Sequence, residues 1–274
     1  MRLMSFLRPD GTPSWGVVSG ETVSDLLDRA PGLKAALAAA ASLAPTGMLW
    51  RLDEVTFRPP IPDPDKIICV GLNYLSHIRE GGREPPGQPT IFTRWANTQV
   101  GHGQPLIRPH ASATLDYEGE LAVVIGRSCR HVGAAEAGTV IAGYACYNDA
   151  SVREWQRHSS QYTPGKNFPC TGGFGPWIVT PDEMGEIAQQ SLVTRLNGVE
   201  VQRATLDDLV FDVPALVEYC STFTRLEAGD VIITGTSGGV GAHRKPPLWM
   251  KPGDVVEVEI SGIGTLRNPV AQEA

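Results

Sequence analysis

The sequence lacks a long apolar run, clustered positive charge and paired cysteines. No stretch of its 274 residues approaches the roughly 20 apolar residues that a membrane-spanning helix requires. Charged residues interrupt the N-terminus too early for the apolar core of a signal peptide. The formal net charge of −7 argues against a surface for nucleic acid or anionic membrane. We therefore expect a soluble protein that is located in the cytoplasm.

The cysteines also exclude classes of site. Cys69, Cys129, Cys146, Cys170 and Cys220 are widely scattered and odd in number, and none forms the C-x-x-C pair of a zinc or redox site. We expect them to be reduced and mostly packed. Because positive charge is scarce, an anionic substrate would need a metal ion or a few well-placed cations as its counter-charge.

A proline-rich segment divides the chain. Four prolines between residues 59 and 64 remove amide donors and exclude both a helix and a central strand. We interpret residues 58–65 as a linker that separates a small N-terminal α+β domain, residues 1–60, from a larger domain, residues 61–274. In the first domain we expect a short strand at residues 15–18 and an alanine-rich helix at residues 33–43.

The larger domain has mainly the pattern of strands. Asn197-Gly198 predicts a two-residue type I′ turn, because both residue types tolerate positive φ, between strands at residues 194–196 and 199–201. Further strands are expected, from apolar runs beside turn residues, at residues 67–71, 116–125, 231–234 and 255–260.

Few helices are expected. One is at residues 151–158, where Ser151 and Glu154 have the spacing of a capping box, and another is at residues 213–223, where Pro214 fits the first turn. Together these elements predict a β-rich α+β protein, a roll or sandwich with short helices.

Three acidic residues are candidate metal ligands. Side chains alternate along a strand, so Glu118 and Glu120 should project from one face and can converge on a cation. Alternatively, both face water. Asp149 follows an apolar run and would either cap the next helix or join the site. Arg153 and Gln156, four and seven residues later, would share its helix face and suit a carboxylate clamp, unless Arg153 only forms an exposed ion pair.

His77 and Glu80 are a candidate general base with its orienting acid. Their spacing of three places them on one helical turn, although most such pairs are surface salt bridges. The glycines and prolines at residues 81–88 are typical of a lid. Lys166 lies in an expected loop, where a lysine is more often solvated than functional.

The order of the motifs resembles the fumarylacetoacetate hydrolase family over roughly residues 65–270. The motifs that carry the resemblance are Gly71-Leu72-Asn73-Tyr74 with His77 and Glu80, Asp116-Tyr117-Glu118-Gly119-Glu120, Asn148-Asp149 with Ser151, Arg153 and Gln156, Gly165-Lys166-Asn167-Phe168, Gly175-Pro176-Trp177, Asn197-Gly198, Gly229-Asp230 with Thr234-Gly235-Thr236, and Lys251-Pro252-Gly253-Asp254.

The resemblance implies a mixed β-sandwich roll, a homodimer and a divalent ion. The ion would be held by Glu118, Glu120 and Asp149, whose oxygen donors suit Mg²⁺ or Mn²⁺, with Ca²⁺ also accepted. The expected roles of the other matching residues are a base dyad on a mobile lid for His77 and Glu80, charge stabilisation for Lys166, and substrate binding for Tyr74, Arg153, Gln156 and Thr236.

The implied activity is a divalent-metal-dependent hydrolase that cleaves a carbon–carbon bond of an acylpyruvate, such as a fumarylpyruvate-like acid, through a metal-stabilised enolate. Within the family, the alternative is decarboxylation, tautomerisation or hydration of an oxaloacetate-like acid or a 2-hydroxy-dienoate. Outside this class, a non-catalytic metal-binding β-sandwich must be considered. The sequence departs from the family at Ser237, where proline is usual, and residues 81–88 and 158–162 are expected to determine specificity.

Overall fold

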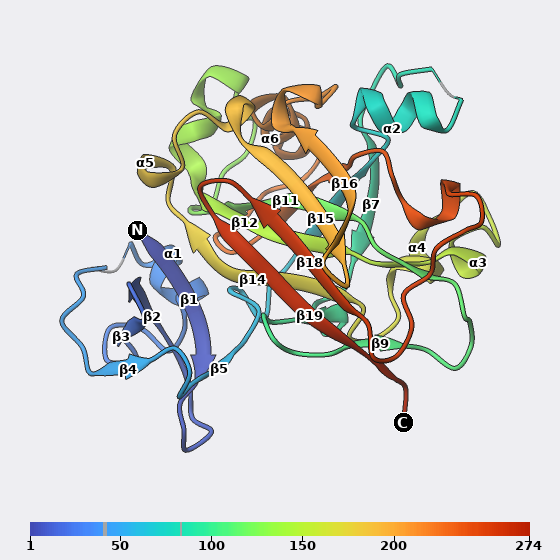
Figure 1. Cartoon of the computed structure of the whole chain (residues 1–274). Helices are drawn as coiled ribbons and strands as arrows, with labels where there is room; N and C mark the ends of the chain where they lie inside the picture. Colours follow the sequence, from blue (N-terminus) through green and yellow to red (C-terminus); the bar gives the residue numbers. More distant parts are fainter. Residues whose placement is uncertain (41–42, 83) are drawn as a thin grey trace.

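The structure is a computed structural model that describes residues 1–40, 43–82 and 84–274. Figure 1 shows a strand-rich molecule with short helices around two sheets. The β-rich α+β class and the mixed sandwich expected from the sequence are confirmed.

The larger sheet runs through most of the chain. Its strand order is β4-β3-β2-β1-β14-β12-β11-β17-β6-β7, with β5 beside β1 and β8 beside β14. Most neighbours are antiparallel, whereas β6 pairs with β17 and β8 pairs with β14 in parallel. The strands of this sheet are β1 (Arg2–Leu7), β2 (Pro13–Ser19), β3 (Thr22–Asp25), β4 (Leu49–Arg51), β5 (Thr56–Phe57), β6 (Ile67–Gly71), β7 (Thr90–Arg94), β8 (Gln99–Val100), β11 (Gly119–Ile125), β12 (Ile141–Asp149), β14 (Gly172–Val179) and β17 (Val231–Thr236).

The smaller sheet covers one face of the larger sheet. Its order is β16-β15-β18-β19-β9, and Figure 1 shows its long strands lying across β11, β12 and β14. The strands of this sheet are β9 (Leu106–Arg108), β15 (Ser191–Leu196), β16 (Val199–Thr205), β18 (Val255–Ile260) and β19 (Gly264–Gln272). A separate pair is formed by β10 (Leu115–Asp116) and β13 (Ser151–Val152).

The helices are short. They are α1 (Leu33–Ala38), α2 (Leu75–Glu80), α3 (Arg153–Gln156), α4 (Thr163–Lys166), α5 (Pro181–Met184) and α6 (Val213–Phe223), together with the 3₁₀ segments η1 (Ala96–Thr98), η2 (Ala134–Val140), η3 (Ile187–Gln189), η4 (Leu206–Asp208) and η5 (Gly241–His243). Among the residues that the structure describes, no helix has the length and apolar character to cross a bilayer. Residues 41 and 42 of the helix expected at 33–43 lie outside the described residues.

Strand β11 is buried on both faces. Leu121, Val123 and Ile125 pack in the core between the two sheets, while Ala122 and Val124 pack in a second core on the opposite face. A strand in this position needs apolar residues throughout, because neither face meets water. The packing on both faces of β11 fixes the positions of Glu118 and Glu120, which flank its first residue, Gly119.

The N-terminal segment extends the larger sheet. Strand β1 pairs with β14, and Leu3 and Trp15 share the second core with Ile67 and Val231. The expected linker at residues 58–65 forms neither helix nor strand. The boundary between residues 1–60 and 61–274 stays a prediction, and the segments on its two sides share one sheet and one core.

Several local predictions were confirmed. Asn197 and Gly198 join β15 to β16 with φ values of 53° and 77°, as a type I′ turn requires. Helix α6 begins after Asp212, whose carboxylate accepts a hydrogen bond from the Ala215 N–H at 2.9 Å, and Pro214 lies in its first turn.

Two local predictions were wrong. The helix expected at residues 151–158 begins only at Arg153, and the Ser151 hydroxyl donates to the Asp149 carbonyl and does not cap the helix. The capping box therefore does not form, because residues 151 and 152 pair with β10 as a strand. The strand expected at residues 116–125 is divided between β10 and β11.

Gly119 is required by the approach of the two sheets. A Cβ atom at this position would lie 2.1 Å from Thr194 Oγ1, while its next contacts would be at 3.4 Å. Residue 119, between Glu118 and Glu120, therefore has to be glycine, because a side chain there would meet Thr194 of β15.

We predict that Gly119→Ala destabilises the protein by about 1–3 kcal/mol, the usual cost of overpacking a core. Thr194→Ala should relieve the clash, since Thr194 Oγ1 has no hydrogen-bond partner among the described residues and its removal breaks no bond. The double variant should therefore be close in stability to Thr194→Ala alone. Urea unfolding of the four proteins measures this coupling, and additive losses would contradict it.

Candidate metal centre and active site

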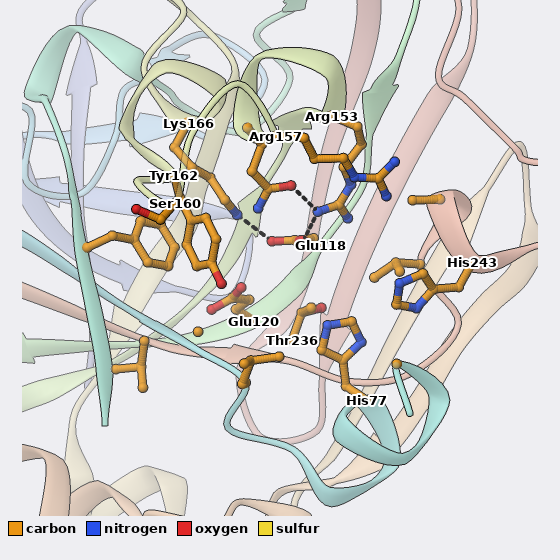
Figure 2. A pocket seen from close by; sticks show the side chains of 18 of the residues that line it. His77, Glu118, Glu120, Arg153, Arg157, Ser160, Tyr162, Lys166, Thr236 and His243 are labelled. Atoms are coloured by element: carbon orange, nitrogen blue, oxygen red, sulfur yellow. Dashed lines mark hydrogen bonds and ion pairs between the residues drawn. The ribbon is translucent and has the colours of Figure 1, made fainter. Parts of the chain in front are cut away.

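A cavity of about 480 Å³ opens where β6, β11 and β17 meet α2, α3 and α4. Its volume is within the range of roughly 300–1,000 Å³ that is common for small-molecule sites. Figure 2 shows side chains from distant parts of the chain converging on it. The predicted residues that line it are His77, Glu118, Glu120, Arg153, Gln156, Lys166 and Thr236, and Arg157, Tyr162 and His243 join them.

Three buried carboxylates lie together at the floor of the cavity, which Glu118 and Glu120 line and the fully buried Asp149 does not. Oxygen atoms of Glu118, Glu120 and Asp149 lie within 4.8 Å of one another, and the three residues are 5%, 2% and 0% exposed. Strand register explains the convergence: Gly119 is opposite Asn148 in the antiparallel pair β11–β12, and the Asp149 N–H donates to the Glu118 carbonyl at 2.8 Å. The alternative in which Glu118 and Glu120 face water is wrong.

Glu118 is held by two cations. Its Oε1 lies 2.6 Å from Arg153 Nη1, and its Oε2 lies 2.5 Å from Lys166 Nζ. Burial alone would raise the pKa of Glu118, but Arg153 and Lys166 outweigh it and lower the pKa to about 2. Glu118 is therefore ionised at neutral pH.

Asp149 is also held by two cations, one of which was not predicted. Its Oδ2 lies 2.5 Å from Lys166 Nζ, and its Oδ1 lies 2.6 Å from Arg94 Nη1. Arg94 is 2% exposed and also donates to the Ala150 carbonyl and the Thr171 hydroxyl. In the sequence, Arg94 only follows a short segment that contains Ile91 and Phe92, and this position does not identify a distant partner.

Glu120 has no cation in direct contact among the described residues. Its Oε2 accepts a hydrogen bond from the Gly235 N–H at 2.5 Å. Burial, together with the charges of Asp149 and Glu118, raises the pKa of Glu120 well above its ordinary value. This uncompensated carboxylate, beside two others and with oxygen as the only donor atom, fits a hard divalent cation such as Mg²⁺ or Mn²⁺.

Lys166 lies at the C-terminal end of α4 and is 1% exposed, so the alternative of a solvated loop lysine is wrong. Its ammonium bridges Glu118 and Asp149, and it lies 5.0 Å from the centroid of the Phe92 ring. Burial would lower the pKa of Lys166, but the charges of Asp149, Glu118 and Glu120 outweigh it and raise the pKa.

Arg153 and Gln156 face the cavity, but not for the reason expected. Asp149 ends β12 outside the helix, so the three residues do not share a helix face. Instead, Arg153 is oriented by Asp116, a buried carboxylate whose Oδ2 accepts from Arg153 Nε at 2.8 Å. Arg153 Nη1 donates to Gln156 Oε1 at 2.9 Å, which leaves the amide nitrogen of Gln156 to donate to a ligand. From the sequence, Asp116 was predicted only to begin a strand, and this role in orienting Arg153 was not expected.

Thr236 lines the cavity at the end of β17. Its hydroxyl donates to the Gly119 carbonyl at 3.0 Å and accepts from Gln202 Nε2 at 2.9 Å, so it connects β17 to β11 beside Glu120. Ser237, in place of the family's usual proline, is buried, and its carbonyl accepts a second hydrogen bond from Gln202 at 3.0 Å.

Tyr74 does not have the position expected of a substrate-binding residue. It is fully buried in the core between the sheets and is absent from the lining of the cavity. The reason is its place before α2, where the chain turns inward and pairs with Leu209. It supports the helix that carries His77.

His77 projects into the cavity from α2, with Glu80 one turn later. Glu80 Oε2 lies 3.5 Å from His77 Nδ1 and 3.2 Å from Nδ1 of His243, a residue of η5. Burial would raise the pKa of Glu80, but its contacts with His77, the Gly239 N–H and His243 outweigh it and lower the pKa to about 2. His243 was not predicted, since its partners are more than 160 residues away.

The outer wall is formed by residues after α3. Ser159, Ser160 and Tyr162 line the cavity, within the segment 158–162 expected to flank the centre, and Arg157 joins them. Arg157 is exposed and has no salt bridge with any residue that the structure describes. Of the expected lid at residues 81–88, Gly81 lines the cavity and residue 83 lies outside the described residues.

Comparisons with known proteins agree with this architecture. The profile of the fumarylacetoacetate (FAA) hydrolase C-terminal family matches residues 66–271. An oxaloacetate tautomerase of human mitochondria is 39% identical over 219 residues, which are 79% of this chain and 70% of that protein.

Two solved structures cover all of this chain at 34% identity each. One is a fumarylacetoacetate hydrolase of Exiguobacterium antarcticum, which is covered completely with a TM-score of 0.90. The other is a 2-hydroxyhepta-2,4-diene-1,7-dioate isomerase of Mycobacterium marinum, of which 99% is covered with a TM-score of 0.84. Together with the family profile, these similarities show that the chain belongs to the fumarylacetoacetate hydrolase family, whose members include hydrolases, isomerases and tautomerases.

Proposed function

We propose that this protein is a divalent-metal-dependent enzyme that moves a proton at the carbon beside the keto group of a 2-oxo dicarboxylic acid, and so interconverts keto and enol forms. The observation that carries the proposal is the arrangement of a histidine base and a buried carboxylate triad around one cavity. The similarity to an oxaloacetate tautomerase and to a dienedioate isomerase supports proton transfer as the reaction.

The residues that would hold the metal are Glu118, Glu120 and Asp149. When bound, a divalent cation supplies a Lewis acid that draws electron density from the 2-oxo and carboxylate oxygens of the substrate. Lys166 holds Glu118 and Asp149, Arg153 holds Glu118, and both cations would add positive charge beside a bound substrate.

His77 is the proposed base. It would take the proton from the carbon next to the keto group while the electron pair of that bond moves to the keto oxygen, and the proton would return at oxygen or at another carbon. Glu80 lies close enough to stabilise the imidazolium that forms. Gln156, with its free amide donor, is suited to bind a carboxylate oxygen.

Hydrolysis of an acylpyruvate is the second candidate, and the similarity to a fumarylacetoacetate hydrolase favours it. In that reaction His77 would deprotonate a water, and the bond between the attacked carbonyl and the enolate carbon would break. Decarboxylation of an oxaloacetate-like acid needs the same charge stabilisation without a water. The homodimer implied by the resemblance stays a prediction.

We also propose that the substrate has a second carboxylate, which a residue of the outer wall binds. Arg157 places a guanidinium on the wall of the cavity without a carboxylate partner among the described residues. Guanidinium groups bind carboxylates through two parallel hydrogen bonds. The named substrates of the three relatives, oxaloacetate, fumarylacetoacetate and a dienedioate, all have two carboxylates.

We predict that MgCl₂ or MnCl₂ raises the melting temperature of the protein. Binding to the folded state alone stabilises by about 2.7 kcal/mol at a metal concentration of 100 times the dissociation constant. Glu120→Gln removes a ligand and should abolish both the shift and turnover, whereas Glu136→Gln, an exposed carboxylate in η2, should retain them. Full activity of wild-type protein after treatment with a chelator would contradict the proposal.

We predict that His77→Ala lowers the rate of proton exchange at the carbon beside the keto group by about 10²–10⁴-fold, the usual contribution of a general base. Exchange of that proton of oxaloacetate in D₂O, followed by NMR, measures the step directly, and the same spectra distinguish enol, cleavage and decarboxylation products. His110→Ala, an exposed histidine outside the cavity, is the matched control. Unchanged exchange in His77→Ala would exclude His77 as the base.

We predict that Arg157→Ala raises KM for oxaloacetate about tenfold with little change in kcat, which corresponds to about 1.4 kcal/mol of lost binding. Acetylpyruvate, which has one carboxylate, should show no such increase. Arg157→Lys should give an intermediate KM, because an ammonium binds carboxylate through fewer hydrogen bonds. Equal effects on both substrates would argue against recognition of the second carboxylate.

A further inference from the structure

A second set of possible metal ligands lies at the entrance of the cavity. His77 and Glu80 are one turn apart on α2, and His243 comes from η5, near the other end of the chain. One ligand atom from each lies within 4.8 Å of the other two. Figure 2 shows both imidazoles at the same side of the cavity, and their rings are stacked with centroids 5.5 Å apart and an interplanar angle of 17°.

The donor atoms differ from those of the carboxylate centre. Two imidazole nitrogens and one carboxylate oxygen suit Zn²⁺, Co²⁺ or Ni²⁺, whereas Mg²⁺ prefers oxygen ligands alone. A site with three protein ligands leaves a coordination position for water or for an anion in the cavity. The two sets of ligands should therefore select different ions.

The cluster contains an unsatisfied polar atom. His77 Nδ1 is inaccessible to solvent and has no hydrogen-bond partner among the described residues; Glu80 Oε2 lies 3.5 Å from it. An unpaired buried polar atom is costly, and coordination of a metal would satisfy it.

The two elements that carry the ligands are held together independently of a metal. The Gly239 N–H donates to both Glu80 oxygens, at 3.2 and 3.1 Å, and the Gly238 N–H donates to the Ser76 hydroxyl at 3.5 Å. Arg244 donates to the carbonyls of Gly239 and Val201 and so fixes the loop before η5. The three ligands are thus already close together before an ion arrives.

We propose that His77, Glu80 and His243 form a second metal site, selective for zinc or a similar ion that accepts imidazole, at the entrance of the cavity. Binding of Zn²⁺ would release any proton on the two coordinating nitrogens and form Zn–N and Zn–O bonds without a change of oxidation state. As a consequence that rests on the proposed function, bound Zn²⁺ would occupy His77 and inhibit proton transfer.

The test is zinc binding by untagged protein in excess MgCl₂, which keeps the carboxylate centre occupied. Equilibrium dialysis with metal analysis should find one Zn²⁺ per chain. His243→Ala should weaken this binding at least ~10-fold, because even loss of a residue that only hydrogen-bonds to a ligand typically costs that much. His110→Ala should bind like the wild type. Equal zinc binding by wild type and His243→Ala, or no zinc binding by wild type, overturns the proposal.

Two further measurements distinguish zinc at the second site from misfolding of the variant and from zinc bound at the carboxylate centre. Co²⁺ bound by the wild type should give the visible absorption of a nitrogen-ligated site, and this result does not depend on whether His243→Ala folds. Glu120→Gln should retain the zinc, so its loss in that variant would assign the ion to the carboxylate centre and overturn the proposal. Binding is measured without turnover, so it can fail or succeed independently of the proposed reaction.

Discussion

Charge compensation in the buried floor of the cavity is the constraint on which the rest of the site depends. Asp116, Glu118, Glu120 and Asp149 are each 5% exposed or less. Three buried cations, Arg94, Arg153 and Lys166, face these four carboxylates, so full ionisation would leave one negative charge unbalanced. Buried charges are tolerated only when they are paired, and Glu120 is the member that has no salt bridge to a cation among the described residues.

The fold supplies these cations from separate elements. Arg94 ends β7, Arg153 begins α3 and Lys166 ends α4, while the acids lie around β10, β11 and β12. The short helices α3 and α4 therefore have a direct role, since they bring positive charge to the ends of buried strands. The smaller sheet completes the arrangement by closing the face that Gly119 presents to Thr194.

Several elements of the fold and several residues of the cavity could be predicted from the sequence, and the predictions that were wrong have physical reasons. The hairpin at Asn197-Gly198 and helix α6 were predictable because turn and capping chemistry is local. Resemblance pointed to Glu118, Glu120, Asp149 and Lys166, which the structure brings together, but alternation alone left Glu118 and Glu120 open to a solvated alternative.

Partners that are distant in the sequence could not be predicted. Arg94 meets Asp149 across 55 positions, and His243 meets Glu80 across 163. No local pattern distinguishes such residues from surface charges. Tyr74 shows the opposite error, since a motif residue beside the lid was assigned to the substrate although its ring is needed in the core.

The cavity therefore combines a buried floor, in which the charges compensate one another, with a more exposed wall. Carboxylates and their cations are buried and mutually dependent, so substitution of one alters the charge balance of all. Arg157 and His243 are instead exposed, and both line the cavity. Because these two side chains lie outside the charge balance of the floor, we expect changes at Arg157 or His243 to alter which substrate or ion binds while leaving the compensated floor intact.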